Sequence, residues 1–379
     1  MKCNGIDTAS GNHLGLSFSE VIESVEDVLA PGEPSVYVAP GFIDLQVNGF
    51  SGVDYNEPDA PHEEIARSIH VMFSAGVTRF FPTVITGSPD RMAGALRNLA
   101  AARERLPGGA AMEAFHVEGP FISPEDGPRG AHPREWVRAP DLDEFHRLQV
   151  AAEGLIRLIT VSPEWPDSAR FIEQLVREGV TVSIGHTKAD ARQIDEAVSA
   201  GATLSTHLGN GAHAVLSRHP NYIFDQLAED RLAASFIVDG IHLGHAFLQT
   251  AIRAKGAERT ILVTDAVQPA GCAPGFYAMA GLPVELSPDG SVRLRENGRL
   301  AGSALMMDRA ISNVMKMAGV SLRDAITMAT RNPARIGRVA SRMRGLAPGE
   351  RADIVRFRRE EDGSIRVIET WMGGRRVFG

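Results

Sequence analysis

Cysteine is scarce in this sequence: Cys3 and Cys272 are the two present in 379 residues. Their number and separation give neither a disulfide framework nor a Cys-x-x-Cys metal motif, so we expect two free thiols in a reducing compartment. The sequence also lacks an apolar run long enough to cross a bilayer, and its first residues lack the apolar core of a signal peptide. We therefore expect a cytoplasmic protein with no membrane partner.

Positive charge is in deficit as well, with 39 Lys and Arg against 47 Asp and Glu and a net charge of −8. A nucleic-acid-binding protein would show a clustered basic face, so nucleic acid is not an expected partner. Apolar residues make up 44% of the chain, which is ordinary for a soluble enzyme. The length exceeds the usual limit of one hydrophobic core, which predicts one large barrel with a small accessory domain.

Short apolar runs alternate with amphipathic helical patterns from about residue 41 to residue 340. Eight strands are predicted: Gly41–Gly49, Val77–Ile85, Glu113–Pro120, Ile156–Glu164, Thr181–Thr187, Thr203–Asn210, Ala233–Leu243 and Thr260–Gln268. Helical patterns between them include Ala60–Ala75, Pro89–Leu106, Ser168–Glu178, Lys188–Ala200 and Leu243–Lys255. Strands separated by crossover helices are parallel, and eight such units predict a (β/α)₈ barrel of the TIM type.

An open doubly wound sheet is the alternative α/β architecture. It usually carries a Gly-x-Gly-x-x-Gly turn after its first strand. Residues 47–53 read Val-Asn-Gly-Phe-Ser-Gly-Val and lack that turn. The closed barrel is therefore the favoured prediction.

The two ends of the chain follow a different pattern. Residues 1–40 are polar and rich in turns, with one β-like run at Ser35–Ala39, and residues 345–379 contain a hairpin that turns at Gly373-Gly374. We predict that 1–40 and 345–379 form one small β-sandwich-like domain, and that 41–344 form the barrel. Within the barrel segment, Phe276–Leu300 is predicted to be a β-hairpin with its turn at residues 288–290.

Polar residues at the C-terminal ends of barrel strands point into a shared mouth. Glu118, His186 and His207 stand at three predicted strand ends, and Asp265 stands at a fourth. One carboxylate and two imidazoles with an open position are typical of a catalytic zinc site, although iron, manganese or cobalt can occupy the same ligands. Such an ion polarises a carbonyl and activates water, and Asp265 is placed to carry the proton from water to a leaving nitrogen.

Each of these residues also has an ordinary structural explanation. A single Asp or His near a strand end is more often a cap or a hydrogen-bonded scaffold residue than a catalyst. Three ligand types at three strand ends, with an acid at a fourth, are harder to explain in that way. His116 lies inside an apolar run, so we interpret it as a core histidine.

The ordered motifs resemble the N-acetylglucosamine-6-phosphate deacetylase family of the amidohydrolase superfamily. The similarity runs through residues 40–49 (Pro-Gly-Phe-Ile-Asp-Leu-Gln-Val-Asn-Gly), 116–121 (His-Val-Glu-Gly-Pro-Phe), 185–187 (Gly-His-Thr), 206–208 (Thr-His-Leu), 239–242 (Asp-Gly-Ile-His), 263–266 (Val-Thr-Asp-Ala) and 301–303 (Ala-Gly-Ser). It covers most of the chain in the right order. Most amidohydrolases carry His-x-His in the first strand, whereas Gln46 and Asn48 stand here, which implies one metal ion and not two.

The resemblance also implies roles for individual residues. By similarity, Glu118, His186 and His207 hold the metal ion, and Asp265 is the general base and acid. His132 matches a histidine that contacts the substrate near the acyl carbonyl. The sugar phosphate end is matched by four residues: Asn210, Gly211, Arg218 and His242. In the family a neighbouring subunit completes that end, which implies a homodimer.

Residues 209–226 depart from the family pattern. Gly209 stands where the family has an aromatic residue, which predicts less bulk on the substrate side, and the run from Arg218 to Gln226 adds bulk and an acid. The leading hypothesis is therefore hydrolysis of an N-acetyl amino sugar, with the 6-phosphate of N-acetylglucosamine as the first candidate. The same chemistry on an unphosphorylated sugar, an N-acyl amino acid or a cyclic amide is the second, and a non-catalytic barrel is the third.

Overall fold

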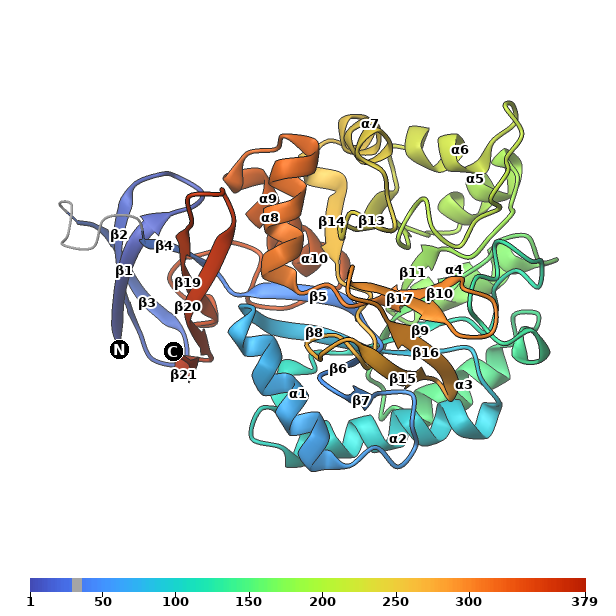
Figure 1. Ribbon diagram of the computed structural model, residues 1–379, viewed down its shortest axis with the longest axis horizontal. Helices are drawn as coiled ribbons and strands as arrows, with labels where there is room; N and C mark the ends of the chain where they lie inside the picture. The colour runs from blue at the N-terminus through green and yellow to red at the C-terminus, as the bar shows by residue number, and fades with distance from the viewer. Residues whose placement is uncertain (29–35) are drawn as a thin grey trace.

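The centre of the protein is a closed barrel of parallel strands (Figure 1). The computed structural model describes residues 1–28 and 36–379. Eight strands pair in the order β14-β13-β12-β11-β10-β9-β8-β5, and a parallel bridge between Val47 and Ala266 closes the ring. The strands are β5 (Phe42–Val47), β8 (Val77–Ile85), β9 (Phe115–Glu118), β10 (Ile156–Val161), β11 (Thr181–Ile184), β12 (Leu204–Ser205), β13 (Ala233–Ile237) and β14 (Thr260–Val263).

The predicted barrel is confirmed, and each of the eight predicted strand regions contains one of these strands. Most strands end earlier than their apolar pattern. β12 was predicted to extend to Asn210 but ends at Ser205, because the backbone at His207 and Gly209 has positive φ angles of 29° and 101°. A residue in that conformation leaves the extended region and ends the strand. The mouth of the barrel is therefore built from tight loops.

Helices cover the outside of the barrel. They are α1 (His62–Ser74), α2 (Pro89–Arg105), α3 (Leu142–Ala151), α4 (Ser168–Arg177), α5 (Ala191–Ser199), α6 (Tyr222–Ala228), α7 (His245–Lys255), α8 (Met307–Ala318), α9 (Leu322–Ala329) and α10 (Arg331–Ile336). Local chemistry sets their starts: the Ser88 side chain accepts from the Arg91 amide before Pro89, and Asp190 and Gln193 form a capping box. In α4 the buried Phe171, Ile172 and Leu175 repeat at helical spacing.

A four-stranded antiparallel sheet, here called the cap sheet, follows β14. Its strands are β15 (Gly275–Met279), β16 (Leu282–Leu286), β17 (Ser291–Leu294) and β18 (Leu300–Ser303). The predicted turn at residues 288–290 joins β16 to β17, but the segment forms four strands where one hairpin was predicted. The cap sheet packs Met279 and Val292 against Ile85 and Val267, so it lies beside the barrel mouth.

Both ends of the chain contribute to one seven-stranded sheet beside the barrel, at the left of Figure 1. Its order is β21-β20-β19-β4-β1-β2-β3, formed by β1 (Lys2–Asp7), β2 (His13–Phe18), β3 (Ile22–Asp27), β4 (Val36–Pro40), β19 (Ile354–Arg359), β20 (Ile365–Met372) and β21 (Arg375–Phe378). Phe18 of β2 contacts Trp371 of β20 edge-on at 5.9 Å between ring centroids. Because β2 and β20 are not neighbours in the sheet, it curls over its own core, as the sandwich-like prediction requires.

The sequence prediction found only part of this sheet. Strands β1, β2 and β3 were missed because Gly and Asn, which are uncommon in strands, made residues 1–40 resemble a series of turns, although the buried residues of β2 alternate regularly. The predicted run at Ser35–Ala39 corresponds to β4 from Val36 onward, and Ser35 lies outside the described residues. The domain boundaries at 40/41 and 344/345 stay a prediction.

A buried cluster of charges joins this sheet to the barrel. Asp353, just before β19, lies 3.1 Å from Nε of Arg79 on β8 and 2.8 Å from Nη1 of Arg342. All three side chains are at most 2% exposed. We call this group the junction cluster. Among the residues described, no helix is long and apolar enough to span a bilayer.

Candidate metal centre and active site

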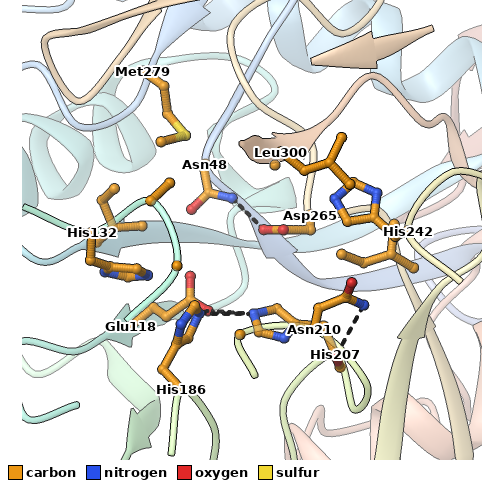
Figure 2. A pocket seen from close by; sticks show the side chains of 16 residues that line it. Asn48, Glu118, His132, His186, His207, Asn210, His242, Asp265, Met279 and Leu300 are labelled. Atoms are coloured by element: carbon orange, nitrogen blue, oxygen red, sulfur yellow. Dashed lines mark hydrogen bonds and ion pairs between the residues drawn. The ribbon is translucent and has the colours of Figure 1, made fainter. Parts of the chain in front are cut away.

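Three predicted ligands converge at the barrel mouth. Oε1 of Glu118, at the end of β9, lies 3.1 Å from Nε2 of His186 and 2.9 Å from Nε2 of His207, and the two nitrogens are 3.1 Å apart. All three side chains are buried. Figure 2 shows them facing one another on the floor of a cavity of about 110 Å³. The three atoms are within 4.8 Å of one another, which is the arrangement of a metal-binding group.

The hydrogen bonds around the cluster fit a cation. Nδ1 of His186 is 2.8 Å from the carbonyl oxygen of Pro128, which can only accept, so Nδ1 is the donor and Nε2 is the nitrogen that faces the cluster. Nε2 lies beside a carboxylate oxygen and a second imidazole nitrogen. Within the described part of the chain, the ion pairs of Glu118 are with these imidazoles alone. A divalent ion would satisfy all three atoms at once.

The pKa values of His207 and Glu118 are shifted by the interaction between the two groups. Burial alone lowers the pKa of His207, yet the hydrogen bond and charge of Glu118 outweigh burial and raise it. Burial alone raises the pKa of Glu118, but its bonds to His186 and His207 hold it well below its usual range. Glu118 is therefore an ionised carboxylate, which makes the centre of the mouth attractive to a cation.

The backbone at this centre is held in an uncommon conformation. His186, His207 and Asp265 have positive φ angles of 48°, 29° and 50°. Non-glycine residues adopt this region at a cost and do so most often at functional sites. Each of the three lies two residues after the end of a barrel strand, and the turn directs its side chain across the mouth.

Asp265 lies opposite the cluster and is held by two amides. Its Oδ1 accepts from Nδ2 of Asn48 at 2.7 Å and from Nε2 of Gln46 at 3.0 Å. Gln46 also donates to Glu118 at 3.1 Å, so it bridges the two acids. Burial, with a contribution from the charge of Glu118, raises the pKa of Asp265 to about 6. A carboxyl group with a raised pKa is suited to accept and return a proton near neutral pH.

His132 forms one side of the cavity. It is buried, and its ring contacts that of His186 edge-on at 4.4 Å. Its Nδ1 is 2.8 Å from the hydroxyl of Thr86. Burial, followed by the charge of His186, lowers the pKa of His132 to about 3, so the ring is neutral and acts as a hydrogen-bonding group.

His242 and Asn210 lie at the opposite side (Figure 2), and Gly211 also lines the cavity. Nδ1 of His242 lies 2.6 Å from Asp239, which fixes the ring. Gly211 has a positive φ of 55°, and a Cβ there would come within 2.7 Å of Nδ1 of His186. Only glycine fits this close approach, so Gly211 is tied to the cluster as well as to the cavity wall.

Within the divergent segment, residues 209–226, Asn210 and Gly211 line the cavity but Arg218 does not. Arg218 is exposed and is absent from the cavity lining, and no hydrogen bond or ion pair joins it to the described residues. The space left by Gly209 is not open to substrate: a Cβ there would meet Phe247 at 2.7 Å and Leu243 at 2.9 Å. At Gly209 itself, Phe247 of α7 fills the gap, and the reduced bulk predicted for the rest of residues 209–213 stays a prediction.

The sequence reasoning missed Thr86 and Asp239, which orient His132 and His242. Thr86 directly follows β8, and the rule that strand ends carry site residues would have found it had the second strand been examined. Asp239 lies in a quoted motif but was given no role. The imidazole of His116 is buried against Thr160 at 2.8 Å, as expected of a core histidine.

Comparison with known proteins identifies relatives along nearly the whole chain. Residues 37–377 match the model of the amidohydrolase family. The chain is 32% identical to an N-acetylglucosamine-6-phosphate deacetylase of Bacillus subtilis (87% of this chain, 82% of the relative) and 32% identical to an N-acetylgalactosamine-6-phosphate deacetylase of Escherichia coli (89% and 86%). A Mycobacterium smegmatis N-acetyl-D-glucosamine-6-phosphate deacetylase variant, solved with N-acetyl-D-glucosamine-6-phosphate, superimposes with a TM-score of 0.87 at 28% identity (97% of this chain, 95% of the other).

Proposed function

Because the chain belongs to the amidohydrolase family, and within it to the N-acetylglucosamine-6-phosphate deacetylases, we propose that it hydrolyses N-acetylglucosamine 6-phosphate to glucosamine 6-phosphate and acetate. The observation that carries this proposal is the buried group formed by Glu118, His186 and His207, with Asp265 across the cavity. A hydrolase of this kind needs a metal site that activates water and a nearby acid that transfers the proton.

Glu118, His186 and His207 are the proposed ligands of one divalent ion per subunit. When bound, such an ion polarises the scissile carbonyl and lowers the pKa of water. Zinc is the proposed ion, with iron, manganese and cobalt as alternatives, since two nitrogens and one oxygen suit all four. Gln46 and Asn48 direct their amide nitrogens toward Glu118 and Asp265, so they orient the acids and leave room for a single ion.

Asp265 is the proposed general base and acid. It takes a proton from water as the oxygen attacks the carbonyl carbon, and it returns the proton to the nitrogen as the C–N bond breaks. Asn48 and Gln46 hold the carboxylate so that its second oxygen faces the cavity. The neutral His132, fixed by Thr86, is proposed to hydrogen-bond near the acyl group.

Asn210, Gly211 and His242 are proposed to bind the sugar phosphate. Arg218 is exposed outside its own cavity, and Val215 and Phe224 of the same segment are 88% and 56% exposed. An apolar, exposed segment with an arginine suits contact with a second copy, so we include a homodimer in which Arg218 reaches the neighbouring phosphate. A guanidinium matches a phosphate dianion well.

Acetate release is the direct test. The purified protein, loaded in turn with zinc, iron, manganese and cobalt, is assayed against the 6-phosphates of N-acetylglucosamine and N-acetylgalactosamine. Turnover of the glucosamine compound supports the proposal, turnover of the galactosamine compound alone keeps the reaction but corrects the sugar, and inactivity on both with a full metal complement contradicts it. Metal analysis of the protein as purified also tests the scaffold alternative, which has no need for a stoichiometric ion.

The exposed Arg218 is the observation that favours the second candidate, hydrolysis of an unphosphorylated sugar, an N-acyl amino acid or a cyclic amide. Arg218→Ala separates the two. Loss of turnover on the phosphorylated sugar together with unchanged turnover of a non-phosphorylated substrate supports phosphate recognition. A best substrate whose turnover Arg218→Ala does not alter favours the second candidate. Light scattering of the wild-type protein measures the oligomeric state.

The proposal also includes a cytoplasmic location for the protein.

A further inference from the structure

A second cavity lies directly behind one wall of the active-site cavity. It has a volume of about 270 Å³ and is here called the side recess. Ile85 lines both cavities, and the two linings continue along the same chain segments: Ala131 and His132 face the active site where Pro133 faces the recess, and Met279 faces the active site where Ala280 faces the recess. A thin wall therefore separates them.

The wall is apolar on the active-site side. Ile85 and Met279 are 5% and 4% exposed and belong to the same apolar cluster under the cap sheet. Thr86 continues the wall through its bond to His132. Figure 2 shows Met279 and His132 at one side of Glu118, with His242 at the other.

The side recess has a mixed lining. Val84, Met92, Trp136 and Leu282 contribute apolar surface, and Asn56, Ser88, Arg91 and Glu135 contribute polar groups. Arg91 is paired with Glu57 at 2.6 Å. A short hydrocarbon chain that enters beside Ile85 can bury its surface against the apolar part of this lining.

The polarity of the active site orients the acyl group toward this wall. The anionic end of the proposed substrate belongs beside His242 and Asn210, whose ring and amide nitrogens can donate to it, because Ile85 and Met279 offer it no hydrogen bond. The amide carbonyl belongs at the cluster between the two ends. The acyl methyl group then projects toward Ile85 and Met279.

We propose that Ile85 is the residue that restricts the acyl group to acetyl, and that the side recess accepts the chain of a longer N-acyl group once this side chain is shortened. The inference rests on the proposed function, since it uses the orientation of that substrate. It adds a specificity determinant for the acyl part and a pocket of defined chemistry behind it.

The test compares N-acetyl-, N-propanoyl- and N-butanoylglucosamine 6-phosphate in the wild type, Ile85→Val and Ile85→Ala. The measured quantity is the ratio of kcat/KM for butanoyl to that for acetyl. Burial of one methylene is worth about a fourfold change, so two methylenes predict a rise of about 15-fold in Ile85→Ala. Ile85→Val removes a single methylene and keeps the branched side chain, so it should give a smaller rise in the same direction.

Val292→Ala is the matched control. Val292 is fully buried in the same apolar cluster but lines neither cavity, so its truncation loosens the cap sheet without opening the wall. The ratio should stay at the wild-type value. An unchanged ratio in both Ile85 variants, or an equal rise in Val292→Ala, overturns the proposal.

Failure of this inference is distinguishable from failure of the proposed function. If the wild type does not hydrolyse the N-acetyl substrates, the proposed function is wrong. The chain-length ratio is then measured on whichever N-acyl amide the enzyme does hydrolyse, because the wall faces the acyl group. If the wild type is active and the ratio does not respond to Ile85, only the wall proposal is wrong.

Discussion

Two buried carboxylates in this protein, Glu118 at the barrel mouth and Asp353 at the junction cluster, have opposite surroundings. Each is at most 2% exposed. Asp353 lies between the guanidinium groups of Arg79 and Arg342, at 3.1 and 2.8 Å, and accepts from the amide of Gly373 at 2.7 Å. Glu118 lies among two imidazole nitrogens and the amide of Gln46. The chain supplies permanent cations to one and none to the other.

This difference separates a structural cluster from a binding site. A buried charge without a counter-charge is costly, so Asp353 with its arginines is complete as it stands and fastens the terminal sheet to the barrel. Glu118 needs a positive charge from outside, and its neighbours are ligands that divalent ions accept. Burial by itself would have ranked the two clusters alike.

The largest effect is expected at Asp265, which shares the mouth with Glu118 but is not a proposed ligand. Asp265→Asn keeps the size of the side chain and removes its basicity, so kcat should fall by about 10³-fold. Metal content should stay at the wild-type level, measured by elemental analysis beside the assay. Substantial remaining turnover would move the base role to another group.

The next effect is expected on metal binding. Glu118→Gln removes the charge at the centre of the cluster, and its metal affinity should fall by at least the roughly 10–100-fold seen when weaker supporting groups are lost. Zinc should raise the thermal stability of the wild type and fail to do so for this variant. Asp353→Asn is the control, and it should bind metal as the wild type does. Equal affinity in Glu118→Gln would exclude Glu118 as a ligand.

At the junction cluster the effect should appear in stability alone. Asp353→Asn leaves Arg342 buried without its counter-charge and leaves Arg79 only the more distant carboxylate of Glu113 at 3.6 Å, so the free energy of unfolding should fall by about 3–5 kcal/mol. Urea titration measures this change. Activity per folded molecule should remain, because the cluster lies at the sheet junction and lines no part of the active-site cavity. A loss below about 1 kcal/mol would show that the cluster is dispensable.

A third buried carboxylate, that of Asp44 on β5, is hydrogen-bonded to neither an arginine nor a histidine among the described residues, and it extends the comparison. Its partners are the amide and hydroxyl of Thr264, at 3.2 and 2.6 Å, and the amide of Gln46 at 3.3 Å. Burial outweighs these bonds and raises the pKa of Asp44 from 3.8 to about 7. Between these two values the folded state holds more protons than the unfolded state.

Asp44 should therefore contribute a decrease in the stability of the metal-free protein as pH rises from about 4 to about 7, of at most about 1.4 kcal/mol per pH unit. Asp44→Asn cannot ionise and should lack this contribution. Urea titrations at several pH values in the presence of a chelator measure the two slopes. Parallel slopes in wild type and variant would contradict a raised pKa.

Periodicity and strand ends alone predicted much of the fold and the centre of the site. The alternation of apolar runs with helical patterns is local, and a barrel places every strand end at one mouth, so Glu118, His186, His207 and Asp265 could be grouped without coordinates. Strands β1 to β3 were missed because their Gly, Asn and other polar residues resemble turns, although β2 alternates regularly; they pair with each other and with β4.

Only the tertiary structure determines which segments that are remote in sequence come into contact. Arg79 and Asp353 are 274 residues apart, and nothing local marks them as a pair. The packing of α7 brings Phe247 against Gly209. The packing of the cap sheet brings Met279 beside Ile85. Periodic patterns record which face of an element is buried; the identity of the neighbour on that face is set by packing of the whole chain.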